Sequence, residues 1–357
     1  PDDPELDDLG DGITADGLVE SHFVVGRFLK AGGYAALLRF FQKDLGLRAG
    51  QNLQLFAYDW RRDLKVAARR LATRADGWLR AWQSQSGNDT ARIVLVGHAM
   101  GGLVGRYYAD VEGGWPSVRQ IVTLGAPFLG SVRALDLLYF GVDFQSYGLP
   151  LHDVTPIART FTSVYQLLPH YPSIHTFTGE IVSPFDMRIP TFEHQKMERS
   201  RQLHRDLGDH HSRNRTIEGY SQLRSTSIAG IGQPTVERAR LLANGTLSVD
   251  TDPRETEADG DGLVPRFSAD ASGPGGFNTH SLYVPQSHGM LASDPVVHGH
   301  LADLLVERKP GEAPPRTPLP RLTIRRTTGD QHRIDADTIA VTVAKPFYKV
   351  GQSIEIR

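Results

Sequence analysis

The stretch from residue 92 to residue 104 constrains the fold more than any other part of the sequence. It reads RIVLVGHAMGGLV, an unbroken apolar run that enters Gly97-x-x-x-Gly101 and continues with apolar residues at helical spacing. This pattern predicts a buried strand, a sharp turn and a helix. We expect Ala99, at the centre of the turn, to have a strained backbone. We also expect a side chain at Gly97 or Gly101 to collide with the neighbouring strand or helix.

Apolar runs and helical patterns alternate along much of the remaining chain. Helices are predicted over residues 34–45 and 64–82, strands over 52–58, 120–124, 227–231 and 282–284, and a hairpin around Asn244-Gly245. Strands that are apolar throughout and alternate with helices indicate a mostly parallel sheet with helices on both faces. The predicted fold class is therefore α/β.

Breaks in this alternation divide the chain into four predicted parts. Residues 1–130 form the first part of the core, 131–222 an inserted cap, 223–308 the second part of the core and 309–357 a β-rich extension after a proline-rich joint. The cap contains a polar stretch rich in histidine and arginine. It also contains an apolar run from Leu135 to Phe140, which is either a lid that meets lipid or a core helix of the cap.

Composition excludes several classes of protein and of site. The formal net charge of −2 gives no electrostatic reason to expect nucleic acid as a partner. No apolar stretch reaches 18 residues, so no membrane-spanning helix is predicted. The chain has no cysteine, which excludes disulfides, thiolate zinc sites and a cysteine nucleophile. The same absence fits a reducing compartment and favours a cytoplasmic location.

Metal and cofactor sites are not predicted. The acidic residues from Glu257 to Asp261 faintly resemble a calcium loop, but the twelfth position is Ser268 where an EF-hand needs glutamate. The histidines at 204, 210 and 211 lack a partner carboxylate at metal-ligand spacing. No glycine-rich loop of the phosphate-binding type occurs.

Two downstream residues complete a pattern that starts at Ala99. Asp261 lies between two glycines after a strand and a hairpin, and His288 follows the last predicted strand. In enzymes whose nucleophile lies in the turn of a strand–turn–helix motif, the nucleophile, the acid and the base occur in this order along the chain. An isolated Asp and His are more often a solvated turn residue and a surface histidine. The required order and context favour an acid–base pair.

Five motifs together resemble the lecithin:cholesterol acyltransferase family, over about residues 15 to 295. They are Tyr58-Asp59-Trp60-Arg61, Gly97-His98-Ala99-Met100-Gly101-Gly102, residues 124–131 (LGAPFLGS), residues 260–265 (GDGLVP) and His288. The resemblance implies an α/β-hydrolase fold with Ala99 at the nucleophilic serine position, Asp261 as the acid and His288 as the base. It also implies that the backbone N–H of Met100 is half of the oxyanion hole. The motifs at 58–61 and 125–127 would shape the site, by packing alone or by direct contact with substrate.

This sequence departs from the family pattern in two places. Ala99 has no nucleophilic atom. The family's opening strand, with the loop that supplies the second oxyanion donor, has no counterpart in the sequence, and we expect both to precede residue 1.

These observations predict a serine esterase, lipase or acyltransferase acting on lipid-like acyl esters, inactive as written because of Ala99. Retention of Gly97, His98, Gly101, Asp261 and His288 favours an engineered serine-to-alanine change. The alternative is a natural pseudoenzyme that acts as an acyl-lipid binding module or as a regulatory module. The expected partners are an acyl-ester substrate, with long acyl chains bound by the cap, a lipid surface touched peripherally, and a protein bound through residues 309–357.

Overall fold

The computed structural model describes residues 2–6, 9–18, 24–25, 29–30, 33–141, 155–249, 259–272 and 276–305. The pattern of contacts separates Pro1–Glu307 from Arg308–Arg357. The predicted β-rich extension, residues 309–357, lies outside the described residues, so its strands and its partner stay predictions.

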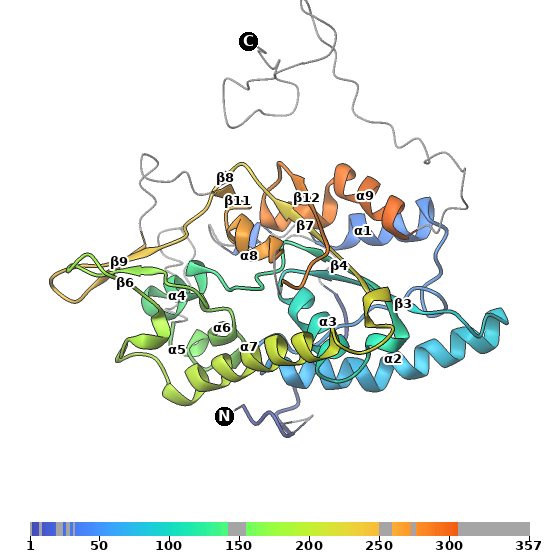
Figure 1. Cartoon of the computed structure of the whole chain (residues 1–357), viewed down its shortest axis with the longest axis horizontal. Helices are drawn as coiled ribbons and strands as arrows, with labels where there is room; N and C mark the ends of the chain where they lie inside the picture. The colour runs from blue at the N-terminus through green and yellow to red at the C-terminus, as the bar shows by residue number, and fades with distance from the viewer. Residues whose placement is uncertain are drawn as a thin grey trace, which may run out of the picture. The chain divides into compact units, whose positions relative to one another are not determined.

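A parallel sheet forms the centre of the first unit (Figure 1). Its strands, in spatial order, are β12 (His280–Val284), β7 (Arg224–Gly230), β4 (Val118–Leu124) and β3 (Ile93–His98), and each neighbouring pair is parallel. This confirms the predicted mostly parallel sheet and its strands at 120–124, 227–231 and 282–284. Because the strands run the same way, their carboxyl ends meet at one edge of the sheet, where α/β proteins place their sites.

Helices cover both faces of this sheet, as predicted. The neighbouring residues Ile121 and Val122 of β4 belong to different hydrophobic clusters, because successive side chains of a strand point to opposite faces. Ile121 packs with α2 (Leu64–Ser86) and α3 (Met100–Asp110). Val122 packs with residues of α1 (Ala35–Arg39), of its π-helical continuation Phe40–Asp44 and of α9 (Pro295–Leu305).

The predicted cap contains three short helices, α4 (Val132–Phe140), α5 (Thr155–Ala158) and α6 (Thr162–Gln166). Residues of α4 and α6 pack with a small sheet, whose strand order is β10 (Leu247–Ser248), β9 (Ala239–Leu241), β5 (Ile174–His175) and β6 (Ile181–Val182) (Figure 1). The β9–β10 pair is the hairpin predicted around Asn244-Gly245, with a φ of +81° at Gly245. This hairpin comes from the segment assigned to the core, so the boundary at residue 222 stays a prediction.

The apolar run in the cap is mainly a core helix. Leu135 and Leu138 are fully buried in the cluster that joins α4 to α6 and to the small sheet. Phe140, at the end of α4, is 48% exposed, and Leu137 and Tyr139 are partly buried. The core-helix alternative therefore describes Leu135 and Leu138, and the lid alternative stays a prediction for the more exposed side chains of the run.

Two elements differ from prediction. The run 52–58 is not a strand, because its one bridge joins Leu53 to Ala49 and the described residues offer it no pairing strand. The polar stretch of the cap contains a long helix, α7 (His194–Asn214), that the sequence analysis did not predict. Leu203 and Leu207 anchor it in the cluster of α2 and α3. This narrow apolar face is enough to hold a helix whose other residues are mostly polar or charged.

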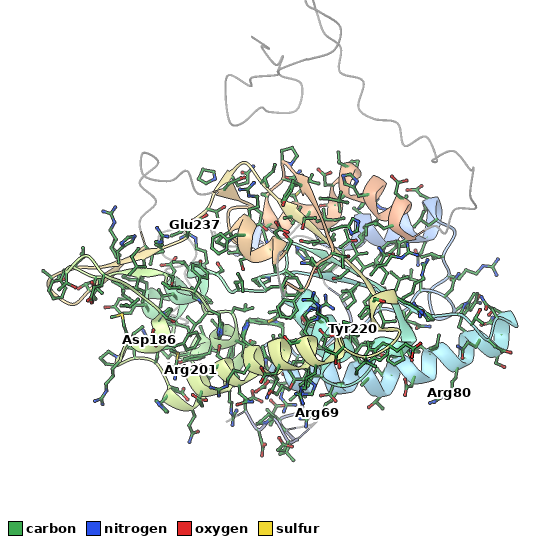
Figure 2. All side chains as sticks on the ribbon, in the orientation of Figure 1. Arg69, Arg80, Asp186, Arg201, Tyr220 and Glu237 are labelled. Atoms are coloured by element: carbon green, nitrogen blue, oxygen red, sulfur yellow. The ribbon has the colours of Figure 1, made fainter. Side chains whose placement is uncertain are left out.

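The long helices keep a charged outer face. Arg69 and Arg80 on α2 and Arg201 on α7 lie on that face (Figure 2). No helix among the described residues is both long and apolar enough to cross a membrane. The remaining elements are β1 (Val24–Val25), β2 (Leu29–Lys30), β8 (Gln233–Pro234), β11 (Asp259–Gly260), α8 (Arg266–Asp270) and the 3₁₀ turns Trp115–Ser117, Pro184–Asp186, Tyr220–Gln222 and His288–Ser293.

Candidate active site

The predicted strand, sharp turn and helix are present at Ala99. Strand β3 ends at His98, helix α3 begins at Met100, and Ala99 between them has φ 51° and ψ −126°. Its amide donates a hydrogen bond to the carbonyl of Leu124 on β4, at 2.9 Å, and its carbonyl accepts from the amide of Gly102. These bonds fix the turn at the carboxyl edge of the sheet and hold the Ala99 backbone in a region that non-glycine residues rarely adopt.

Close approach of neighbouring atoms explains why Gly97 and Gly102 are glycines. The role of Gly102 was not predicted. A Cβ at Gly97 would lie 2.7 Å from backbone atoms of Gly101 and Gly102, so the predicted collision is confirmed there. At Gly101 the nearest atom would be the Tyr58 hydroxyl at 3.9 Å, so the predicted collision is wrong. The helix instead approaches its neighbour at Gly102, where a Cβ would lie 2.5 Å from the Cβ of Ala126.

Asp261 is buried and held on both carboxylate oxygens. Its side chain is 1% exposed. Oδ1 accepts hydrogen bonds from the amides of Leu263 (3.0 Å) and Val264 (2.7 Å), while Oδ2 lies 2.7 Å from Nδ1 of His288. The flanking glycines permit this loop, since Gly262 has a φ of +89° and a Cβ at Gly260 would lie 2.4 Å from the Val264 carbonyl. The loop therefore presents one carboxylate oxygen to the histidine.

His288 begins the 3₁₀ turn that follows β12. Its amide donates to the Asp261 carbonyl at 2.8 Å, and its Nδ1 faces the Asp261 carboxylate. Because an ionised carboxylate only accepts hydrogen bonds, Nδ1 carries the proton. In the neutral form of the ring Nε2 is then the unprotonated nitrogen, which is the arrangement that a general base needs.

Glycines at the ends of two strands let the Asp261–His288 pair lie close to Ala99. The Cβ position of Gly125, at the end of β4, is 2.8 Å from Oδ2 of Asp261 and 3.2 Å from Nδ1 of His288. The Cβ position of Gly230, at the end of β7, is 2.5 Å from the Cβ of Asp261. The amide of Ala99 donates a hydrogen bond to the carbonyl of Leu124, the residue before Gly125. Ala99 therefore lies about one strand spacing, ~4.8 Å, from this end of β4. The structure thus brings Ala99, Asp261 and His288 together.

The amide of Met100 lies beside Ala99 at the start of α3. The first N–H groups of a helix have no acceptor within the helix, and the helix dipole places partial positive charge there. This amide is therefore available to an oxygen atom that develops negative charge next to Ala99.

The Tyr58–Arg61 motif lies between the cap and the strand–turn–helix junction at Ala99. The Tyr58 hydroxyl faces Gly101, and burial raises the pKa of Tyr58. The guanidinium of Arg61 donates to both carboxylate oxygens of Asp59, from Nε at 2.7 Å and from Nη2 at 2.5 Å. Trp60 is 53% exposed, and its ring lies 5.3 Å from that of Phe161 in the cap. Tyr58 therefore packs against the start of α3, while about half of Trp60 is open to solvent.

Two residues of the site were not identified from the sequence as functional. His98 lies with Nε2 3.1 Å from the carbonyl of His288 and Nδ1 2.9 Å from the hydroxyl of Tyr34. Burial lowers the pKa of His98 to about 4, and burial raises the pKa of Tyr34. His98 and Tyr34 are 64 positions apart, and no local pattern signals their contact.

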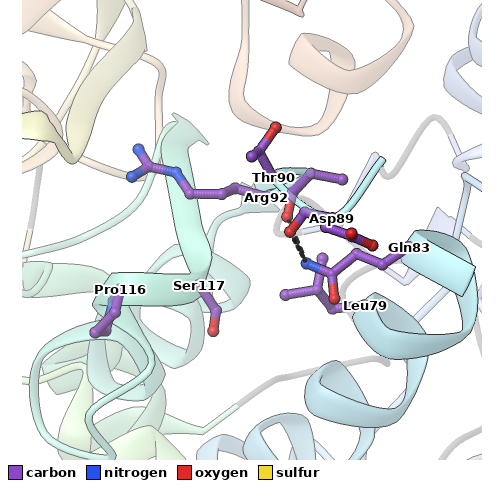
Figure 3. A pocket seen from close by; sticks show the side chains of 8 residues that line it. Leu79, Gln83, Asp89, Thr90, Arg92, Pro116 and Ser117 are labelled. Atoms are coloured by element: carbon purple, nitrogen blue, oxygen red, sulfur yellow. Dashed lines mark hydrogen bonds between the residues drawn. The ribbon is translucent and has the colours of Figure 1, made fainter. Parts of the chain in front are cut away.

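Other candidate sites lie away from this edge or have no metal-binding geometry. A hollow of about 520 Å³ lies at the opposite edge of the sheet, next to the starts of β3 and β4 (Figure 3). It is lined by Leu79, Gln83, Asp89, Thr90, Ala91, Arg92, Pro116 and Ser117. Gln83 spans part of it by donating to the carbonyl of Asp89 at 3.1 Å. Within the described residues, no group of three or more His, Asp or Glu side chains could hold a metal ion.

Comparison with known proteins identifies a family. A family model described as Lecithin:cholesterol acyltransferase matches residues 27–219, which is more than half of the 357 residues. No curated protein matches the chain.

Similar solved structures include a complex and a lipase. The structure described as "The crystal structure of Tle4-Tli4 complex" is 16% identical with a TM-score of 0.49, over 68% of this chain and 65% of that one. This chain therefore spans just under two thirds of its length. The mature form of Bacillus licheniformis lipase BlEst2 is 14% identical with a TM-score of 0.36, over 70% and 75% of the two chains. Its propeptide form is 13% identical with a TM-score of 0.42, over 84% and 55%.

Proposed function

The chain belongs to the lecithin:cholesterol acyltransferase family, and from this premise we propose that its site performs serine-dependent acyl transfer from lipid-like esters. In the form described here the nucleophile is absent, because Ala99 occupies its position. The fold is that of the α/β-hydrolases, with the site at the carboxyl edge of the parallel sheet.

One observation carries the proposal. The strained strand–turn–helix junction at Ala99 lies next to an oriented Asp261–His288 pair. The side chain of Ala99 itself cannot act as a nucleophile. A histidine whose Nδ1 is held by a buried carboxylate and whose Nε2 is left unprotonated is set up to accept a proton. Packing alone does not require a carboxylate to be oriented on both oxygens beside such a junction.

With serine at position 99, the reaction has two halves. The serine Oγ attacks the ester carbonyl while Nε2 of His288 takes its proton, and the Met100 amide stabilises the oxyanion. The C–O bond of the leaving alcohol then breaks, and His288 returns the proton to the departing alkoxide. Water or an acceptor alcohol next attacks the acyl-enzyme by the reverse proton transfers. Hydrolase and acyltransferase differ only in this acceptor.

Restoring the nucleophile tests the proposal. The chain as it stands should hydrolyse short and long acyl esters at a rate close to background, and Ala99→Ser should raise turnover by about 10⁶-fold, the size of the loss when a triad nucleophile is removed. The double variant Ala99→Ser/His288→Ala is the matched control, because it has the serine without its base. Equal turnover by the alanine and serine forms would show that Ala99 is not the nucleophile position.

The second candidate is a natural pseudoenzyme that binds an acyl lipid without cleaving it, which Ala99 itself favours. The genomic codon at position 99 separates the two directly. A serine codon means that alanine was introduced, and an alanine codon favours the binding module. In both cases the acyl ester would occupy the same site, with Phe140 of the cap as the exposed apolar residue nearest in sequence to the Gly125–Ser131 loop.

A further inference from the structure

Two strands separate the elements that carry the nucleophile position and the base. The sheet order is β12-β7-β4-β3, so the residue after β3 and the residue after β12 start about 14 Å apart, at ~4.8 Å per strand. Above the sheet edge the chain closes this gap. The rings of His98, the last residue of β3, and His288, which follows β12, have centroids 5.0 Å apart.

The contact between them has a defined direction. A backbone carbonyl only accepts, so the bond from His98 to the His288 carbonyl requires a proton on Nε2 of His98. Burial lowers the pKa of His98 to about 4, so its ring is neutral at ordinary pH and Nδ1 carries no proton. Nδ1 then accepts from the Tyr34 hydroxyl, which stays protonated because burial raises the pKa of Tyr34. Tyr34 thus selects the tautomer of His98 that can bind His288.

His288 is held at three points, and Asp261 supplies only two of them. The Asp261 carbonyl accepts the His288 amide, and the Asp261 carboxylate accepts Nδ1–H. The 3₁₀ turn that starts at His288 orders the next peptide within its own loop, but neither of those two bonds ties it to the turn at Ala99. The third bond, from His98 to the His288 carbonyl, fixes that peptide to the residue directly before Ala99. The base is therefore tied to the nucleophile-bearing turn and to the acid loop.

We propose that His98 and Tyr34 are positioning residues that hold the base in register with position 99, through the chain of hydrogen bonds from Tyr34 to His98 to the His288 carbonyl. The proposal rests on the proposed function, since it concerns the same acid–base pair. Neither residue touches the reacting atoms in this arrangement. A displacement of about 1 Å in a reacting group can cost about 100-fold in rate, so a positioning role has a measurable size.

The first test uses the serine form. His98→Leu removes the donor, and we expect kcat to fall about 10- to 100-fold with KM changed less than about two-fold. His98→Gln is the conservative variant, because its amide N–H can reach the place of Nε2, and it should recover most of the loss. Tyr34→Phe keeps the ring and removes only the hydroxyl, and a smaller loss of about three- to ten-fold is expected as the tautomer becomes mixed.

The matched control is His298→Leu. His298 also donates from its Nε2 to a backbone carbonyl, that of Ala292 at 2.9 Å, and it stacks on Phe40. The two substitutions remove the same kind of bond, but His298 lies outside the site. His298→Leu is expected to lower stability and to leave kcat unchanged.

The second test needs no turnover and uses the chain with Ala99. Proton NMR of the imidazole N–H signals, assigned by their loss in His288→Ala, reports the bond from His288 to Asp261. His98→Leu should broaden or remove the His288 Nδ1–H signal through faster exchange with water, whereas His98→Gln and His298→Leu should retain it. If the serine form proves inactive, the proposed function fails and this NMR comparison alone decides the positioning role.

The result that overturns the inference is equal behaviour of the two leucine variants. If His98→Leu keeps both kcat and the His288 signal, as His298→Leu should, then His98 only packs beside the base. If His98→Leu does not fold, Tyr34→Phe decides between the same outcomes. An unchanged kcat and an unchanged His288 signal in Tyr34→Phe would then contradict the positioning role of the hydrogen bonds from Tyr34 to His98 to His288.

Discussion

At the scale of single residues, the backbone of Ala99 stores strain. Its φ of 51° with ψ −126° costs a non-glycine residue about 1–3 kcal/mol, while glycine adopts it freely. We predict that Ala99→Gly raises the free energy of unfolding by about 1 kcal/mol, after about 0.4–1 kcal/mol is subtracted for the greater freedom of glycine in the unfolded chain. Urea denaturation measures this difference.

Ala72→Gly is the control for that measurement. Ala72 lies in the middle of α2 with ordinary helical geometry, so the same substitution there should lower stability by about 0.5–1 kcal/mol. A loss of stability at both positions would mean that the turn at Ala99 is relaxed in solution.

The acid and the base should differ in the size of their effects. In the serine form we predict that His288→Ala lowers turnover by about 10⁶-fold and Asp261→Asn by about 10⁴-fold, because the asparagine leaves a base in the wrong tautomer. Asparagine is the better substitution at Asp261, since its Oδ1 can still accept from the amides of Leu263 and Val264. Turnover of acyl esters and the far-UV spectrum together check this. Full activity in either variant would remove that residue from the mechanism.

At the scale of elements, the contact of α3 with β4 depends on Gly102. A Cβ there would lie 2.5 Å from Ala126 and 3.0 Å from Thr123 Cγ2, whereas a Cβ at Gly101 has open space apart from the Tyr58 hydroxyl. We predict that Gly102→Ala lowers the free energy of unfolding by about 1–3 kcal/mol, because overpacking forces the helix off the strand. Gly101→Ala should be neutral or stabilising by up to about 1 kcal/mol, because alanine favours the helix.

Thermal or urea unfolding of the two variants side by side separates steric contact from helix propensity. If both alanines destabilise equally, helix α3 does not approach β4 closely at Gly102. If both alanines stabilise the protein, the contact of position 102 with Ala126 does not lower the stability of the folded state.

At the scale of the whole molecule, stability should depend on pH through two stacked histidines of the cap region. The rings of His170 and His204 have centroids 3.6 Å apart, and Arg201 lies near the pair. Burial lowers the pKa of His170 to about 2 and that of His204 to about 4, against about 6.5 in an unfolded chain. Both rings are therefore neutral in the folded protein at pH values where the unfolded chain already binds protons.

The sign of the effect follows from this difference. Stability is fully present above pH 6.5 and falls as the pH drops below 6.5, towards about 4 for His204 and about 2 for His170, by at most about 1.4 kcal/mol per pH unit for each histidine. His204→Gln should reduce the slope, since glutamine does not titrate and can still donate to the Gln166 carbonyl that His204 binds. The measurement is the free energy of unfolding at several pH values, with the exposed His194→Gln as control. An unchanged slope in His204→Gln would mean that the pair is charged or open to water when folded.

Elements with a local sequence signal could be predicted from the order of residues. The apolar run at 93–98, the glycines around Ala99 and the apolar face from Leu64 onward specify a strand, a turn and a helix through spacing alone, because side-chain direction repeats with the backbone. The order of Ala99, Asp261 and His288 along the sequence also predicted an acid–base pair. Their roles stay predictions until the serine form is assayed.

Contacts between residues far apart in the chain became known from the three-dimensional fold. His98 and His288 are 190 positions apart, and their hydrogen bond exists because the loops after β3 and β12 converge above a sheet that keeps those strands apart. The close approach at Gly102, the absence of a pairing strand for 52–58 and the anchoring of α7 by Leu203 have the same origin. Each depends on what another segment places opposite, and periodicity within one segment carries no information about that.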